Sequence, residues 1–142
     1  MTNQEKKAWL MQYRAAEREE RRLSEELERW RSRAESATAR YGADTGSGGD
    51  GRSLEHAAEH IAHLAEQLEH QRIGLVRLRR EIGAAIDAVP DARHRELLRL
   101  RYIDGRTWEQ VAEMMGLSYQ WVCHLHGDAL NGLWLVDPVD NS

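Results

Sequence analysis

The feature that most constrains the fold is a heptad repeat of apolar residues in the middle of the chain. Six of them stand seven apart: Leu54, Ile61, Leu68, Leu75, Ile82 and Val89. The alternate positions of the repeat hold Ala57, Leu64, Gln71, Leu78 and Ala85. This spacing puts the apolar side chains on one stripe of a single helix. Ser53 can cap that helix and Pro90 ends it, so we expect a coiled-coil-like helix over residues 53–89.

A second apolar stripe precedes it. Its members follow alternating steps of four and three, interrupted at Glu20: Trp9, Tyr13, Ala16, Leu23, Leu27, Trp30, Ala34 and Ala37. We therefore expect another coiled-coil-like helix over residues 1–40. Residues 41–52 contain five glycines and are predicted to be a flexible linker. The two helices can fold back as an antiparallel hairpin or pair with a second copy. We expect a homo-oligomer through the heptad helices, but the sequence leaves both arrangements open.

The last third of the chain has a different pattern. Helical segments are predicted over residues 91–103, 108–115 and 119–133, separated by a turn at Asp104 and Gly105 and a second turn at Gly116. Thr107 and Ser118 are suited to cap the second and third of these helices. We expect a compact head over residues 90–136 and a tail over residues 137–142. The fold class is all-α, with two long heptad-patterned helices followed by a three-helix head.

Three residues of this head have the spacing of a helix-turn-helix motif. Ala112 is small where the following helix crosses, Gly116 suits a turn with positive φ, and Val122 falls on the inward face of the next helix. Val111, Leu117 and Leu125 complete the apolar set. An ordinary helical hairpin would not need a small, a flexible and a β-branched residue at those three places together. The spacing therefore favours a DNA-binding motif.

Residues 95–118 resemble region 4 of bacterial sigma factors, in the stretch Arg-Glu-Leu-Leu-Arg-Leu-Arg-Tyr-Ile-Asp-Gly-Arg-Thr-Trp-Glu-Gln-Val-Ala-Glu-Met-Met-Gly-Leu-Ser. The continuation over residues 118–130 resembles small sigma-like proteins of phages and mobile elements, related to late transcription regulators of the ArpU and RinA type. This resemblance is strongest over residues 97–130. It implies that the chain binds promoter or operator DNA, regulates transcription of phage or mobile-element genes and performs no catalysis.

The resemblance also implies where DNA would bind. The helix over residues 119–133 would enter the major groove through its first turns, and Arg106 and Thr107 would touch a phosphate. The candidate DNA-binding residues are Arg106, Thr107, Ser118, Tyr119, Gln120, Cys123 and His124. Gln120 can pair with adenine through two hydrogen bonds. The sequence departs from its relatives at His124 and Asp128, where arginines are usual, so two phosphate contacts are lost.

Composition excludes several other functions. The single Cys123 leaves no disulfide framework or multi-cysteine zinc site. His56, His60, His63 and His70 flank the heptad stripe and are better explained as exposed residues than as metal ligands. Cys123, His124 and His126 point in different directions on a helix, so we expect no enzyme, no cofactor and no metal. Without a signal peptide or apolar span, the chain is expected to be cytoplasmic, with no membrane partner.

The net charge of the chain limits how it can bind a negatively charged partner. The formal charge is −4, and residues 91–142 hold five Lys or Arg against eight Asp or Glu. The chain is therefore not expected to hold DNA by bulk electrostatics. Duplex DNA is still the expected partner, bound through geometry and a few phosphate contacts, with RNA polymerase or a second subunit adding to the binding. Two alternatives remain: a sigma-like factor that binds polymerase or a regulator with little DNA affinity of its own, and a recognition subunit of a phage DNA-packaging machine. Trp108, Trp121 and Trp134 are expected to pack in the core of the head.

Overall fold

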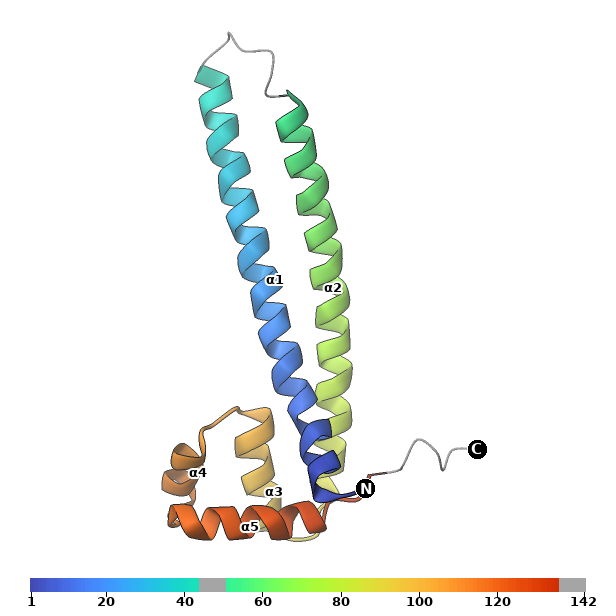
Figure 1. Cartoon of the computed structure of the whole chain (residues 1–142), viewed down its shortest axis with the longest axis vertical. Helices are drawn as coiled ribbons and strands as arrows, with labels where there is room; N and C mark the ends of the chain where they lie inside the picture. The colour runs from blue at the N-terminus through green and yellow to red at the C-terminus, as the bar shows by residue number, and fades with distance from the viewer. Residues whose placement is uncertain (44–50, 136–142) are drawn as a thin grey trace, which may run out of the picture. The chain divides into compact units, whose positions relative to one another are not determined.

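The computed structural model describes residues 1–43 and 51–135, and every regular element in that part of the chain is helical, as predicted (Figure 1). The elements are α1 (Asn3–Ala43), α2 (Gly51–Asp87), α3 (Ala92–Leu98), the π-helix η1 (Arg99–Ile103), α4 (Trp108–Met115) and α5 (Tyr119–Asn131). None of these helices combines the length and the hydropathy that a membrane span needs.

The two long helices pair within one chain, and their contacts fall into two compact units. The first unit contains Met1–Ala16 and Leu75–Ser142, and the second contains Glu17–Gly74. In the second unit, α1 and α2 lie side by side around four buried leucines, Leu23, Leu27, Leu64 and Leu68. Trp30 extends this core, and its ring lies 4.4 Å from that of His60. The heptad positions thus form an intramolecular antiparallel pair.

The first unit is larger than the predicted head, because both long helices contribute to its core. Leu10 and Tyr13 of α1 and Ile82 and Ile86 of α2 are buried in the same cluster as the apolar residues of α3, α4 and α5. Leu10 and Ile86 are fully buried although neither belongs to the predicted heptad stripes. The three-helix region therefore shares its core with both long helices, and the amino-terminal turns of α1 complete that core.

Polar contacts also tie the long helices to this region. The Lys6 ammonium donates to the Leu130 carbonyl over 2.8 Å, at the carboxyl end of α5, where a positive charge is favourable. The Asn3 amide bonds to Asn131 over 2.9 Å. A side chain at Gly105, which has a φ of 71°, would run into the Arg14 guanidinium. At the end of α2, Arg95 donates to the Val89 and Pro90 carbonyls.

Several predicted boundaries move. α1 continues to Ala43 and α2 begins at Gly51, so the helices enter the predicted linker, of which residues 44–50 lie outside the described residues. The predicted helix over residues 91–103 is α3 followed by η1, whose wider turn is closed by a bond from Asp104 N to the Arg99 carbonyl. α5 ends at Asn131, two residues early, and Gly132 is its C-cap.

Two tryptophans expected in the core are exposed. Trp134 is 85% exposed. It lies after the end of α5, where Leu133 turns inward and Leu135 packs against the core. Trp121 is 50% exposed, because it lies in the first turn of α5 and beside the buried face rather than on it. Trp108 is half-buried and packs against the core of the first unit, as expected.

Candidate nucleic-acid interface

The helix-turn-helix geometry predicted from the sequence is present in α4 and α5. The Thr107 hydroxyl accepts from Gln110 N over 3.1 Å, and the Gln110 side chain accepts in return from Thr107 N over 3.0 Å, which makes a capping box. Gly116 ends α4 with a φ of 66°, the left-handed conformation that favours glycine. The Ser118 hydroxyl accepts from Trp121 N and caps α5. The predicted caps and turn are therefore confirmed.

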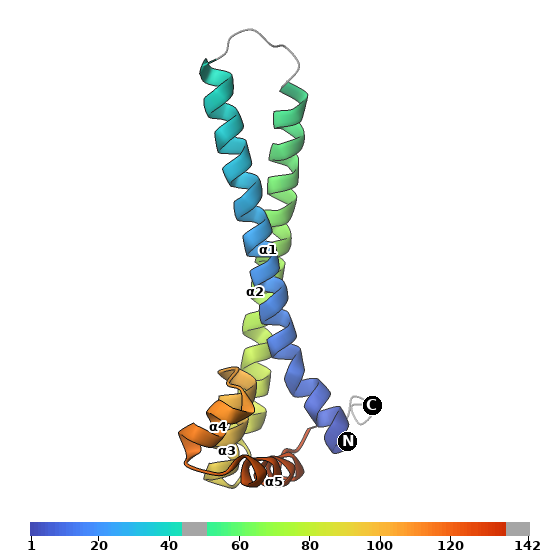
Figure 2. The same ribbon diagram turned by 60° about the vertical axis from the view of Figure 1, so that its left-hand side comes forward.

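The apolar residues of the motif hold the two helices together. Val111 and Val122 are fully buried, Ala112 and Leu125 are nearly so, and Leu117 packs against the same core. In Figures 1 and 2, α5 runs across α3. Its inward face consists of Val122, Leu125, His126, Ala129 and Leu130. This packing leaves the opposite face of α5 open to solvent.

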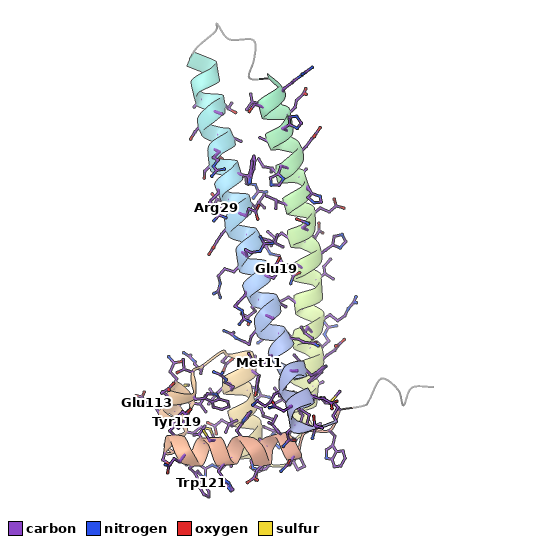
Figure 3. The ribbon with its side chains drawn as sticks, in the orientation of Figure 1. Met11, Glu19, Arg29, Glu113, Tyr119 and Trp121 are labelled. Carbon is purple, nitrogen blue, oxygen red and sulfur yellow. The ribbon has the colours of Figure 1, made fainter. Side chains whose placement is uncertain are left out.

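All seven predicted contact residues are exposed. Arg106 and Thr107 lie at the start of α4, and the other five lie in the cap and first turns of α5. Gln120 and His124 are four residues apart and so project from the same side of the helix. The exposed face also includes Trp121, whose ring centroid is 5.2 Å from that of His124. In Figure 3, Trp121 projects on the side of α5 away from α4.

The large side chain of Trp121 predicts core packing, but Trp121 lies on this exposed face. Its exposure follows from its position along the helix. Trp121 directly precedes Val122, the buried residue of the motif, and directly follows exposed Gln120. On the other edge of the exposed face, Tyr119 lies close to Cys123, and a charge interaction and a hydrogen bond with Cys123 raise the pKa of Tyr119. The exposed face is therefore richer in aromatic side chains than the sequence suggested.

The electrostatics of α5 are unusual for a surface that meets DNA. Residues 118–131 contain no Lys or Arg, and Asp128 lies 3.6 Å from the His124 ring. Arg101 is engaged nearby: its side chain lies over the Trp108 ring at 4.6 Å and donates to the Arg106 carbonyl over 3.0 Å. Of the predicted contacts, only Arg106 carries a full positive charge.

The charge of the whole first unit is more favourable than that of the predicted head. The described residues of this unit include 11 Lys or Arg and 9 Asp or Glu, because residues 1–16 and 75–80 add six cations. With residues 136–142 included, the unit holds 11 Lys or Arg and 11 Asp or Glu and is neutral, whereas residues 91–142 alone have a charge of −3. The long helices thus offset the acidic balance that the sequence suggested for the DNA-binding region.

A buried hydrogen bond fixes α5 against η1. The Tyr102 hydroxyl lies 2.7 Å from Nε2 of His126, and both side chains are buried. Burial raises the pKa of Tyr102 to about 12. Burial, followed by the charges of Lys7 and Arg101, lowers the pKa of His126 to about 4. At neutral pH Tyr102 therefore keeps its proton and can donate it to an uncharged His126 ring, which also meets Trp108 at 4.6 Å.

The burial of His126 predicts how the stability of the folded chain changes at acid pH. The folded pKa of His126, about 4, lies below its ordinary value of 6.5, so the unfolded chain binds the proton more tightly. The free energy of unfolding should therefore fall as pH drops from 6.5 toward 4, by at most about 3 kcal/mol from this residue. Urea unfolding of the whole chain at several pH values measures the loss. His126→Gln should show a shallower loss, whereas equal slopes for both proteins would contradict the assignment.

Comparison with known proteins agrees with this geometry. Residues 90–133 match the family model for sigma-70, region 4. No curated protein and no solved structure matches the chain. The matched residues begin at Pro90, include α3, η1, α4 and α5, and end at Leu133. Residues 90–133 are therefore similar to sigma-70 region 4, a family of DNA-binding helix-turn-helix domains.

Proposed function

We propose that this protein regulates transcription by binding duplex DNA through the exposed face of α5. The observation that carries the proposal is the placement of Gln120 and His124: both are exposed in the first two turns of the second helix of a sigma-70 region 4-like motif. The amino-terminal turns of such a helix enter the major groove, and side chains there contact base edges. The contacts we propose are Arg106, Thr107, Ser118, Tyr119, Gln120, Cys123 and His124.

The regulated genes we propose are those of a phage or mobile element, on the resemblance of residues 118–130 to such regulators. Binding would then take place in the cytoplasm, where this DNA and RNA polymerase meet. We also propose that two or more copies act together on one DNA site, since one copy offers few phosphate contacts. Because most apolar residues of the heptad stripes pack against one another within one chain, an oligomer of this kind would use the outer faces of α1 and α2.

One prediction isolates the phosphate contact. Arg106→Ala should weaken binding by a similar factor on every DNA sequence and make the plot of log K against log salt less steep by about 0.9. Fluorescence anisotropy over a range of salt concentrations measures the slope. Arg29→Ala is the matched control, because Arg29 is an exposed arginine of the second unit, labelled in Figure 3. An unchanged slope for Arg106→Ala would remove Arg106 from the interface.

A second function has one observation in its favour. Glu109, Glu113 and Asp128 are exposed on α4 and α5, and α5 has no cation of its own. An acidic surface with exposed aromatic rings also suits a protein partner such as RNA polymerase. Mobility shifts with DNA from upstream of the genes, run beside a pull-down with purified polymerase, separate the two functions. Retention by polymerase without any shift of DNA would favour the interaction factor.

A further inference from the structure

The chemistry of the exposed face of α5 limits which bases it can read. The commonest specific contact to guanine is a bidentate bond from Arg or Lys to O6 and N7. Residues 118–131 contain neither Arg nor Lys, and His126 is buried against Tyr102 and Trp108. His124 remains as a donor, but Asp128 lies 3.6 Å from its Nε2 atom and competes for it. The helix therefore lacks the usual means of reading G·C pairs.

The side chains that remain on this face suit A·T pairs. Gln120 is exposed in the first turn of α5, and a glutamine amide can bond to both N6 and N7 of adenine. Beside it are apolar surfaces that protrude into solvent, since Tyr119 and Trp121 are each 50% exposed. The major-groove feature of thymine that an apolar side chain can recognise is its C5 methyl group.

The packing of these side chains supports a fixed reading surface. Trp121 lies against His124, with ring centroids 5.2 Å apart, and Tyr119 contacts Cys123 one turn further along. Each aromatic ring is thus supported by a neighbour on the same helix, and Gln120 lies between the two pairs in the helical order. Large aromatic side chains held in this way can contact a methyl group at little cost in side-chain entropy.

We propose that α5 reads an A·T-rich DNA site, with Gln120 bonded to adenine and Trp121 in contact with a thymine methyl group. This inference rests on the proposed DNA binding and goes beyond it by naming the base pairs. Its source is the set of side chains that this chain presents: an amide in the centre of the exposed face, an aromatic ring at each of its edges, and no guanidinium or ammonium group.

The experiment begins with selection of bound duplexes from a random library by the full-length chain. The recovered sites should carry consecutive A·T pairs. Replacement of thymine by uracil at each position of the best site then removes one methyl group at a time, and the critical position should lose about fourfold in affinity. Replacement of the contacted adenine by 7-deazaadenine removes N7 and should cost about fivefold or more.

Variants assign each effect to a residue. Trp121→Ala should no longer distinguish uracil from thymine, and Gln120→Ala should no longer distinguish 7-deazaadenine from adenine. Trp134→Ala and Gln67→Ala are the matched controls, since both side chains are exposed and lie outside the motif. Both controls should keep the full sensitivity to each modified base. Because Trp121 and Gln120 are exposed, their variants should keep the helical circular dichroism of the parent chain.

The outcomes separate this inference from the proposed function. Selected sites whose specificity depends on G·C pairs, with no response to uracil, would overturn the A·T inference and leave DNA binding intact. Binding of every duplex with equal affinity would also overturn it. Failure to recover any duplex, by a chain that is folded and soluble, would overturn the proposed DNA binding itself.

Discussion

Leu10→Ala should destabilise the DNA-binding motif, although Leu10 lies about a hundred residues before it in the sequence. Leu10 is fully buried in the cluster that contains Val111, Val122 and Leu130. Truncation of a buried leucine to alanine typically costs about 2–5 kcal/mol, since it removes buried apolar area and leaves a cavity. That loss is a large part of the stability of a small domain. Chemical unfolding, followed by circular dichroism, measures it.

Met11→Ala is the matched control for this prediction. Met11 is the next residue of α1, but it is 37% exposed, so its truncation should cost less than about 1 kcal/mol. DNA affinity should follow stability in both variants. For the same reason, residues 90–136 alone should fold poorly, because they lack Leu10, Tyr13, Ile82 and Ile86. A stable, DNA-binding fragment of residues 90–136 would show that the core does not need the long helices.

The double substitution Gln120→Ala and His124→Ala should remove most of the sequence preference and leave only the contribution of Trp121. Each good base contact discriminates by about 1–3 kcal/mol, so loss of both should weaken binding to the selected site by at least about thirtyfold. Binding to unrelated duplexes should change by less than about twofold, because that binding depends on phosphate contacts. Competition titrations with specific and unrelated duplexes give both affinities. The variant should remain folded, because both side chains are exposed.

The second unit offers a matched control for this pair. His63 and Gln67 are also a histidine and a glutamine four residues apart, and both are exposed on α2. His63→Ala with Gln67→Ala should leave both affinities unchanged. Equal loss of specific and unrelated binding in the α5 variant would mean that Gln120 and His124 contact phosphates or stabilise the fold instead of reading bases.

Much of the architecture could be predicted, because helix caps, turns and heptad patterns depend on residues that are close together in the sequence. The heptad stripes identified Leu23, Leu27, Leu64 and Leu68 as an interface. Thr107, Gly116 and Ser118 act within a few residues of their own position, and each has the cap or turn that was expected. The all-α class and the helix-turn-helix geometry followed from these signals.

The sequence could not show which long-range contacts complete the motif. Leu10 and Ile86 lie just outside the heptad stripes, where a two-helix pattern assigns them to solvent. They are buried because α3, α4 and α5 supply a second packing surface, and that surface exists only in the folded unit. The charge of the DNA-binding region was underestimated for the same reason, since Lys6, Lys7 and Arg14 join it through α1.

The tryptophans show a different limit. Trp121 stands four residues before buried Leu125, so the helical period placed it at the edge of the inward face. Its large apolar area then favoured burial. Trp134 directly follows the predicted helix over residues 119–133, whose end lies two residues beyond the observed end of α5. After the end of α5, Leu133 is buried and Trp134 is exposed. The exposure of these two rings therefore depends on their exact positions at the edge and at the end of α5, which the sequence pattern does not determine.

The most direct test of the central claim, that the exposed face of α5 binds duplex DNA, is a nuclear magnetic resonance titration of the full-length chain with a selected duplex. Backbone amides of residues 118–124, and those of Arg106 and Thr107, should shift most, while the amides around Leu23 and Leu64 in the second unit should not move. Shifts confined to a surface that excludes α5, or no shifts with any duplex, would contradict the account.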